Sequence, residues 1–276
     1  MAQLVGAFAS SHAPLIARDW DILPTEAKQK ISSGFREMRS RIEELCPDLL
    51  IMLAPDHWVN FFLDNLPAFC IGLGPEHGGP PEPFLSPKFP YKNLKGHPEF
   101  SRHLADTAFE SGFDPSLSYN VNLDHGFCIP LWQLGLDPLP KVIPIFVNEL
   151  EQPMPSIKRC FDWGRMIRSA IVNYPEDLKV AVIGSGGLSH SIGEPTMGKI
   201  DERFDKDCID LFSKANEAEI IEKLIKNLPN AGNGSEEIRS WIIAHAVMNG
   251  EGFELIDYAP ILEVYVGCGW AEWKVA

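Results

Sequence analysis

The chain has 276 residues, of which 45% are hydrophobic, a composition that suits a globular protein with a sizeable core in one large or two small domains. The formal net charge of −14 argues against binding to nucleic acid or to anionic membranes, because both need a basic surface. No hydrophobic run reaches the roughly 20 residues of a membrane span, and no basic signal-peptide region opens the chain. The six cysteines form no C-x-x-C pair. We therefore expect a cytoplasmic protein without a disulfide framework or zinc ribbon.

Hydrophobic runs and a helical pattern alternate in the first quarter of the chain. The runs at 4–9 and 49–54 predict strands that are buried on both faces. Between them, Phe35, Met38 and Ile42 recur at three- and four-residue spacing. This spacing predicts a helix from about residue 24 to 46, with a proline near its first turn. We expect a further strand at 69–73.

Residues 74–97 have a different character, because six of them are proline and several are glycine. Such a composition precludes regular structure over most of the stretch. A loop of this length inside a compact domain tends to be a lid, a binding loop or a subunit contact. We expect its two histidines, His77 and His97, to be solvated.

The rest of the chain again alternates helical and strand patterns. No repeat or linker divides it, which favours a single α/β domain over residues 1–276. Ser235 follows a glycine-rich turn and is expected to cap the last long helix. The sequence predicts helices at 98–111, 154–173, 199–215, 217–226 and 236–249, and strands at 141–147, 180–183 and 261–266.

Four of the eight histidines lie just past a hydrophobic run. His190 ends the turn Gly-Ser-Gly-Gly-Leu-Ser-His that follows the strand at 180–183, and His12, His57 and His125 follow other runs. The turn lacks the Lys-Ser/Thr of a P-loop and the spacing of a dinucleotide-binding motif. A single histidine in such a place is usually a hydrogen-bonded loop residue. Four of them predict a constellation in the crevice at the carboxyl ends of the strands.

One carboxylate completes this set. Glu236 and Glu237 both open the last predicted helix, where acidic residues complement the helix dipole. Only Glu237 shares the hydrophobic face of that helix with Trp241 and Met248. A carboxylate on a buried face must be paired or bind a metal. Two imidazoles and one carboxylate form the ligand set of non-haem Fe(II) oxygenases, although zinc hydrolases use the same set.

Five motifs, in order along nearly the whole chain, resemble the class III extradiol dioxygenases. This family includes the β chain of the protocatechuate meta-cleaving enzyme and the dihydroxyphenylpropionate dioxygenases. The motifs are Ser-Ser-His-Ala-Pro-Leu at His12, Ala-Pro-Asp-His at His57, Asp-His-Gly at His125, Gly-Ser-Gly-Gly-Leu-Ser-His at His190, and Gly-Ser-Glu-Glu-Ile-Arg-Ser-Trp at Glu237.

The resemblance implies a single-domain α/β sandwich with a central, mostly buried sheet flanked by helices. It also implies roles for individual residues. Asp56 and Asp124 each precede a histidine, where they either orient it or cap a loop. The implied roles are Fe(II) ligation for His12, His57 and Glu237, acid–base catalysis for His125 and His190, and lining of the substrate pocket for Ala13 and Phe127.

The implied reaction is extradiol cleavage of a catechol by O2, giving a muconic semialdehyde in aromatic catabolism. His190 is expected to take a proton from the catechol and His125 to donate one later. We expect a homo-oligomer in which either a small helical subunit or the proline-rich loop closes the pocket. One alternative is a metal-dependent hydrolase on the same ligands. The other is a non-enzymatic interaction module, and the presence of all five site residues argues against this second alternative. We expect the lysines of the proline-rich stretch to be solvated or to contact a carboxylate on the substrate; they are Lys88, Lys92 and Lys95.

Overall fold

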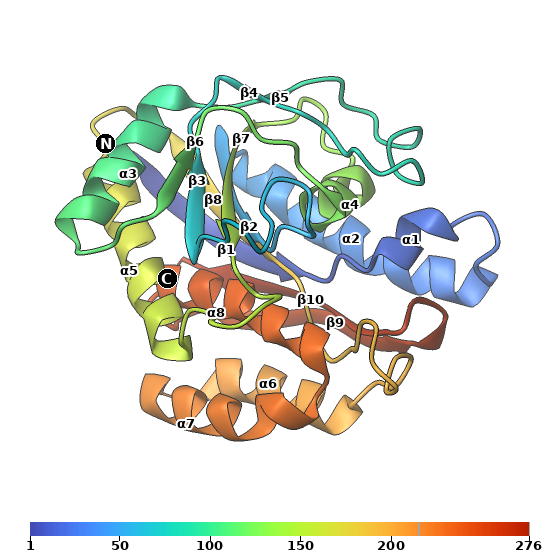
Figure 1. Ribbon diagram of the computed structural model, residues 1–276. Coiled ribbons are helices and arrows are strands. Elements are labelled where there is room, and N and C mark those ends of the chain that lie inside the picture. The colour runs from blue at the N-terminus through green and yellow to red at the C-terminus, as the bar shows by residue number, and fades with distance from the viewer. Residues whose placement is uncertain (215, 276) are drawn as a thin grey trace.

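A large mixed sheet, covered by helices on both faces, forms the centre of the computed structural model, which describes residues 1–214 and 216–275 (Figure 1). Its eight strands lie in the order β6-β3-β7-β2-β8-β1-β10-β9. The strands are β1 (Gln3–Ser10), β2 (Leu49–Ala54), β3 (Phe69–Gly72), β6 (Ser116–Ser118), β7 (Lys141–Val147), β8 (Lys179–Ser185), β9 (Phe253–Ile261) and β10 (Val266–Lys274), and a separate pair is formed by β4 (Glu76–His77) and β5 (Leu94–Lys95).

The four middle strands, β7, β2, β8 and β1, run parallel. Antiparallel strands flank them, β3 beside β7 and β10 beside β1. Every residue of β2 is buried, as expected for a hydrophobic strand with helices on both sides. Because the middle strands are parallel, their carboxyl ends meet at one edge of the sheet.

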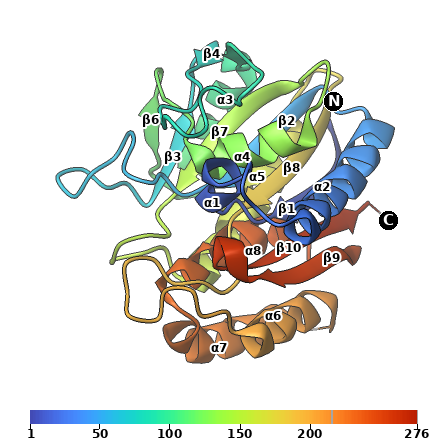
Figure 2. The same ribbon diagram turned by 90° about the vertical axis from the view of Figure 1, so that its right-hand side faces the viewer.

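Two hydrophobic cores fill the spaces between the sheet and the helices. One face is covered by α3, α5 and α8, with α6 and α7 outside them, and the other by α1, α2 and α4. Figure 2 shows α6 and α7 as an outer layer next to α8. The helices are α1 (Pro14–Arg18), α2 (Thr25–Leu45), α3 (Pro98–Glu110), α4 (His125–Leu134), α5 (Ile157–Asn173), α6 (Glu202–Lys214), α7 (Glu217–Asn227) and α8 (Ile238–Val247).

The predicted α/β class with a buried central sheet flanked by helices is confirmed, but the predicted closing strand at 261–266 is wrong. Most of that run is a 3-10 turn at Leu262–Val264 between β9 and β10. Tyr265, just after the turn, has a φ of 62°, which no strand residue adopts. The run is hydrophobic because Val264 and Val266 pack into the core from a hairpin turn, and composition alone does not separate this case from a strand.

Helix α4 was not predicted from the sequence, for two reasons. Its first seven residues are all buried, so the sequence shows no polar face and no helical period. Pro130 also lies inside the helix, where a proline normally argues against one.

The proline-rich stretch is largely irregular, as predicted, but it is anchored to the core. Leu85 and Leu94 have no exposed surface. The expectation that His77 and His97 are solvated is wrong, because they are only 3% and 5% exposed. His97 accepts a hydrogen bond from Phe100 N–H at the start of α3, and burial lowers the pKa of His77 to about 4.

The start of the last helix also differs from the prediction. Ser235 lies inside a 3-10 turn, Asn233–Glu237, and its hydroxyl donates to the carbonyl of Ala231 instead of capping α8. Glu237 ends that turn, so the helical-face argument that singled it out holds only for the residues after it. Ala215, the predicted end of an earlier helix, lies outside the described residues.

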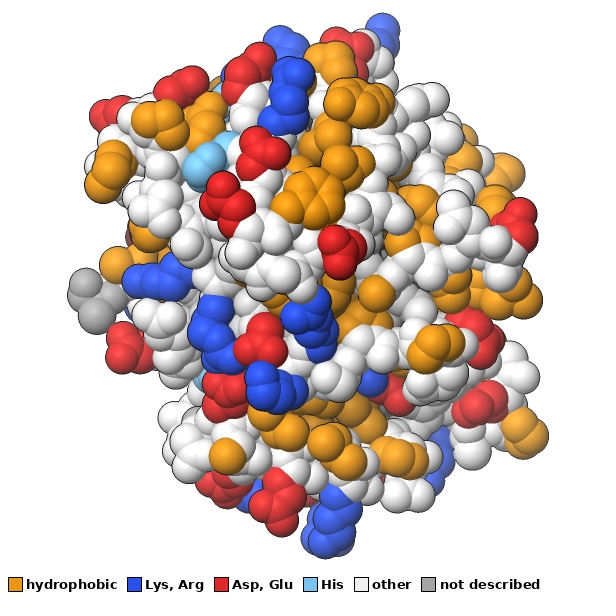
Figure 3. Space-filling view, turned by 60° about the vertical axis from the view of Figure 1, so that its left-hand side comes forward, with side chains coloured by type: hydrophobic (Ala, Val, Ile, Leu, Met, Phe, Trp, Pro, Cys, Tyr) orange, Lys and Arg blue, Asp and Glu red, His pale blue; other side chains and the backbone are white. Residues whose placement is uncertain are grey.

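On the face that Figure 3 shows, acidic and basic side chains are interspersed with hydrophobic ones. Within residues 1–214 and 216–275, no helix combines the length and hydrophobicity needed to cross a bilayer.

Candidate functional site

The site residues expected from the sequence lie at the edge of the sheet where β1, β2 and β8 end. His12 and His57 follow β1 and β2, and the glycine-rich turn after β8 leads to His190. His125 is the first residue of α4, and Glu237 precedes α8. The structure brings these five side chains together around one point.

The carboxylate of Glu237 lies among the imidazoles and is 1% exposed. Its Oε2 is 3.5 Å from His12 Nε2 and accepts a hydrogen bond from Gly187 N–H at 2.8 Å. Its Oε1 is 3.6 Å from Nε2 of both His57 and His190 and has no hydrogen-bond partner among the described residues. A buried, ionised oxygen without a partner is costly unless a cation binds it. The donor set therefore fits a metal ion.

Each imidazole is held through Nδ1, which leaves Nε2 facing the site. Such contacts fix the tautomer and orientation of metal-binding and catalytic histidines. The partners are Ser185 Oγ for His12 (3.0 Å), Asp124 Oδ2 for His57 (3.1 Å), Glu82 Oε1 for His125 (2.8 Å) and the Leu188 carbonyl for His190 (3.1 Å).

The contact of His12 depends on the proline in α4. Pro130 has no N–H, so the carbonyl of Gly126, four residues earlier, lacks its helical donor. Ser185 Oγ donates to that carbonyl at 2.5 Å. Since its only proton is used there, Ser185 must accept from His12 Nδ1–H. His12 Nε2 is then left with its lone pair toward Glu237.

Opposing effects set the pKa values in the site. Burial lowers the pKa of His57, but Asp124 and Glu237 outweigh it and raise the pKa to about 10. Burial and the charge of His57 lower the pKa of His125 to about 4, against the pull of Glu82. Burial also lowers the pKa of His190, but the opposing effect of Glu237 is larger, so the pKa of His190 lies above its ordinary value. Without a metal, the carboxylates thus favour the protonated forms of His57 and His190.

A second possible donor set shares two of these residues. One nitrogen each of His12, His57 and His125 lies within 4.8 Å of the others. The rings of His57 and His125 have centroids only 3.9 Å apart. Geometry alone therefore brings His125 as near to His12 and His57 as a ligand would be.

The two aspartates that precede histidines differ in their contacts. Asp124 caps α4 by accepting from Gly126 N–H, and it also accepts from the N–H of His57 at 2.6 Å. Among the described residues, the carboxylate of Asp56 accepts hydrogen bonds only from residues 59–61, so it holds that loop and orients no histidine.

Glu82 and Ser185 were not among the site residues predicted from the sequence. Glu82 lies in the proline-rich stretch, and its Oε1 accepts from both the backbone N–H and Nδ1 of His125. Marking the stretch as a binding loop was the only signal that pointed toward Glu82. Ser185 was visible only as part of a glycine-rich turn.

A cavity of about 540 Å³ opens above the five site residues. Of the two residues predicted to line the substrate pocket, Ala13 lies in the wall of this cavity, whereas Phe127 is fully buried and packs against Phe146. Its other walls come from α1, from the segments around Trp58 and Leu150, from residues 191–197, and from the β9–β10 turn.

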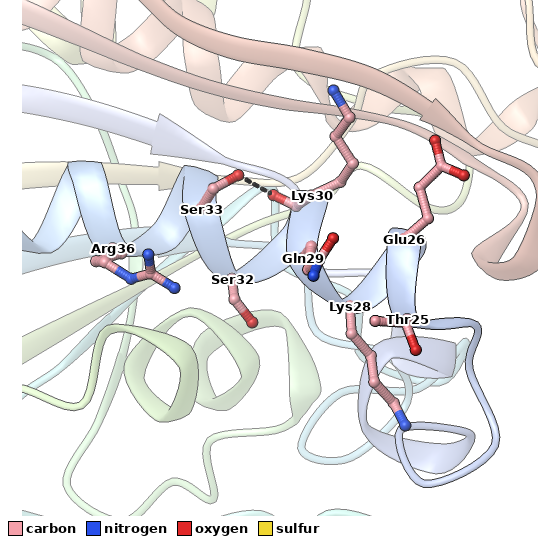
Figure 4. Close-up of a pocket in the computed structure, with 8 residues that line it drawn as sticks. All are labelled: Thr25, Glu26, Lys28, Gln29, Lys30, Ser32, Ser33 and Arg36. Carbon is pink, nitrogen blue, oxygen red and sulfur yellow. Dashed lines mark hydrogen bonds between the residues drawn. The ribbon is translucent and has the colours of Figure 1, made fainter.

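Another hollow runs along the outer side of α2. Figure 4 shows that Thr25, Lys28, Arg36 and the other residues lining it all come from this one helix. None of these residues is a histidine, and their side chains extend outward from the helix, so this hollow offers no comparable constellation.

Comparisons with known proteins agree with this geometry. A family model described as "Catalytic LigB subunit of aromatic ring-opening dioxygenase" matches residues 6–267. The chain is 35% identical over 204 residues to 2,3-dihydroxyphenylpropionate/2,3-dihydroxicinnamic acid 1,2-dioxygenase 2 of Pseudomonas putida, covering 70% of this chain and 59% of that protein. It is also 35% identical over 196 residues to the corresponding dioxygenase of Klebsiella pneumoniae, covering 69% of this chain and 58% of that protein. The chain thus spans somewhat more than half the length of these relatives.

A solved structure shares the fold. The crystal structure of an uncharacterized protein from Escherichia coli K12 superposes with a TM-score of 0.62 and covers 97% of this chain and 99% of that one, at 12% identity.

Proposed function

The chain belongs to the family of the catalytic LigB subunit of aromatic ring-opening dioxygenases, and from this premise we propose that it cleaves the ring of a catechol beside its hydroxyl groups, using Fe(II) and O2. The product is a muconic semialdehyde. The observation that carries the proposal is the buried Glu237 Oε1, which has no partner of its own among the described residues and lies 3.6 Å from two imidazole nitrogens.

His12, His57 and Glu237 hold the metal in this proposal. Both histidines have Nδ1 occupied by an acceptor, so each offers a neutral Nε2. Two imidazoles and one carboxylate are typical of non-haem Fe(II) oxygenases and leave positions open for substrate and O2. Fe(II) bound there would supply Lewis acidity toward the catechol hydroxyls and the electron transfer that O2 requires.

His190 and His125 move protons. The Leu188 carbonyl accepts from His190 Nδ1–H, which leaves Nε2 free to take a proton from a catechol hydroxyl. His125 has a carboxylate, Glu82, on Nδ1. That contact raises the pKa of His125 against the lowering by burial and by His57, and so favours the protonated form that donates from Nε2. Asp124 positions His57 and belongs to the same arrangement.

Several further features belong to the proposal. The substrates are a catechol and O2, and the protein acts as a homo-oligomer in the cytoplasm. The proline-rich stretch 74–97 contributes Glu82, which holds His125 at the site, although none of its residues is among the described residues that line the cavity. Sedimentation analysis measures the oligomeric state directly.

The test is anaerobic reconstitution with Fe(II) or Zn(II), followed by metal analysis and by O2 uptake with a panel of catechols. We expect about one iron per chain, consumption of one O2 per catechol, and a yellow product. Full activity with stoichiometric zinc and without O2 would instead establish a metal-dependent hydrolase.

Paired variants test the ligand assignment. His12→Ala, His57→Ala and Glu237→Gln should each purify without iron. Glu236→Gln is the matched control, because Glu236 pairs with Arg239 and not with any site histidine. His125→Ala and His190→Ala should keep their iron but lose about 10²–10⁴-fold in turnover. Loss of iron from His125→Ala, with iron retained in Glu237→Gln, would assign the alternative three-histidine set.

A further inference from the structure

The walls of the cavity above the site bear on which catechols it accepts. A catechol oriented with its hydroxyls toward His12, His57 and Glu237 must direct its ring substituents toward the walls. Those walls carry four large apolar side chains that are exposed and share this one cavity. Ile192 is 47% exposed, Met197 53%, Trp58 39% and Tyr265 41%. Clustered exposed apolar side chains in a cavity indicate a site for an apolar group.

The charges that line the cavity point the same way. Arg18 is the single lysine or arginine among the described lining residues. Its guanidinium is already engaged, because Nε and Nη2 donate to the two carboxylate oxygens of Asp19 at 2.8 and 2.7 Å. The other fixed charges of the lining are two carboxylates, Glu151 and Glu237.

The lysines of the proline-rich stretch do not supply the missing cation. None of Lys88, Lys92 and Lys95 lines the cavity. Lys88 Nζ donates to the carbonyl of Ala17 and lies 3.4 Å from Asp21. A carboxylate on the substrate would therefore lose water without gaining an unpaired cation, which is unfavourable.

We infer that the preferred substrates are catechols with an uncharged, apolar ring substituent, such as an alkyl or aryl side chain, and that catechols with a carboxylated side chain are disfavoured. This inference rests on the proposed ring cleavage for its biological meaning. The affinity that it concerns is measurable without turnover.

The test compares two ligands of nearly equal shape. They are 2,3-dihydroxyphenylpropionate and 3-(3-methylbutyl)catechol, in which an isopropyl group replaces the carboxylate. Dissociation constants come from anaerobic titration of tryptophan fluorescence with iron-loaded protein, because Trp58 lines the cavity. kcat/KM comes from O2 uptake. We expect about tenfold or greater preference for the alkyl catechol in both measurements.

Two variants locate the cause. Asp19→Asn releases Arg18, and Glu151→Lys adds a cation to the wall, so each should improve binding of the carboxylated ligand about fivefold and leave the alkyl catechol unchanged. Glu43→Gln is the matched control, because it releases Arg39 from a similar pair on α2, outside the cavity.

The outcomes separate the two hypotheses. If the wild-type protein binds the carboxylated ligand as tightly as the alkyl one, or if both variants leave the ratio unchanged, the inference is wrong even though ring cleavage stands. If the protein binds the alkyl catechol preferentially but consumes no O2 with it, the proposed function is wrong and the cavity preference stands. If it binds neither ligand, the inference also fails.

Discussion

At the scale of single residues, the site is defined by what lies behind each histidine. The four Nδ1 atoms face a hydroxyl, two carboxylates and a carbonyl, so each ring has one fixed orientation and presents Nε2. Replacing a partner of this kind typically costs about 10–100-fold in metal affinity or activity. The least expected of them is Glu82, which arrives from an irregular stretch of chain.

Glu82 offers a direct test at this scale. Glu82→Gln keeps an oxygen that can accept from His125 but removes the charge that stabilises the imidazolium. We expect kcat to fall about tenfold or more while the iron content stays unchanged. Steady-state O2 uptake and iron analysis of the same preparation measure both quantities.

Glu76→Gln is the control for Glu82→Gln, because Glu76 is an exposed residue of the same stretch whose side chain, among the described residues, accepts only from Asn93. Equal losses of kcat in the two variants would show a general disturbance of the stretch. A loss of iron in Glu82→Gln would show that His125 is a ligand.

At the scale of secondary structure, α4 combines a structural irregularity with a functional contact. Its proline leaves the Gly126 carbonyl for Ser185, and Ser185 in turn orients His12. The missing helical hydrogen bond at Pro130 thereby influences the orientation of His12, a proposed metal ligand on another segment.

Pro130→Ala should separate stability from metal affinity. An alanine N–H can bond to the Gly126 carbonyl, so α4 should be at least as stable as in the wild type. That N–H then competes with Ser185 for the Gly126 carbonyl and loosens the contact between Ser185 and His12, so iron affinity should fall about tenfold. Urea unfolding of the metal-free protein and competition with a chelator measure the two effects. Ser185→Ala should weaken iron binding to a similar degree, and unchanged affinity in both variants would contradict this connection.

Helix α6 is tied to the β9–β10 hairpin through one buried acid. Asp205 has no exposed surface and accepts hydrogen bonds from Ser189 and from the hydroxyl of Tyr258. Burial raises the pKa of Asp205 from 3.8 to about 6, although these donors oppose the shift. The folded state thus binds a proton in a pH range where the unfolded chain does not.

The proton bound by Asp205 makes the free energy of unfolding depend on pH. Between about pH 4 and pH 6 the folded state holds the extra proton, so the Asp205 contribution to stability falls as the pH rises. The fall amounts to about 3 kcal/mol. The free energy of unfolding of Asp205→Asn, relative to the wild type, should therefore increase by about this amount from pH 4 to pH 7. A difference that stays constant with pH in urea unfolding would contradict the assignment.

At the scale of the whole molecule, the site joins elements that are far apart in the sequence. Its residues come from the ends of three parallel strands, from the start of α4 and from the turn before α8. A metal ion that bridges these segments binds the folded state and not the unfolded chain. Its removal should therefore lower the stability of the entire domain.

Metal removal can be measured in this way. At a free Fe(II) concentration of 100 times Kd, binding should add about 2.7 kcal/mol to the free energy of unfolding. Anaerobic urea unfolding with Fe(II), compared with a chelator, measures the gain. The His12→Ala variant is the control and should show almost none. An equal gain in wild type and variant would place the metal elsewhere.

The sequence alone determined the features that depend on neighbouring residues. Hydrophobic runs marked the central strands because a strand buried on both faces has few polar positions. Histidines that follow such runs were recognisable because the carboxyl ends of parallel strands converge. Glu237 was identified partly from a helical phase that begins only after it, so its position relied more on the resemblance than on the helix.

Only the tertiary structure decided the features that depend on contacts between distant segments. Glu82 reaches His125 because the proline-rich stretch folds back over α4, and no local pattern encodes that path. Ser185 became a partner of His12 only through a carbonyl left free by Pro130. The β9–β10 hairpin resembled one strand because side chains from a turn and from a strand are equally hydrophobic when both pack into a core. Local chemistry thus fixed which residues could react, and packing over long sequence distances fixed how each is held.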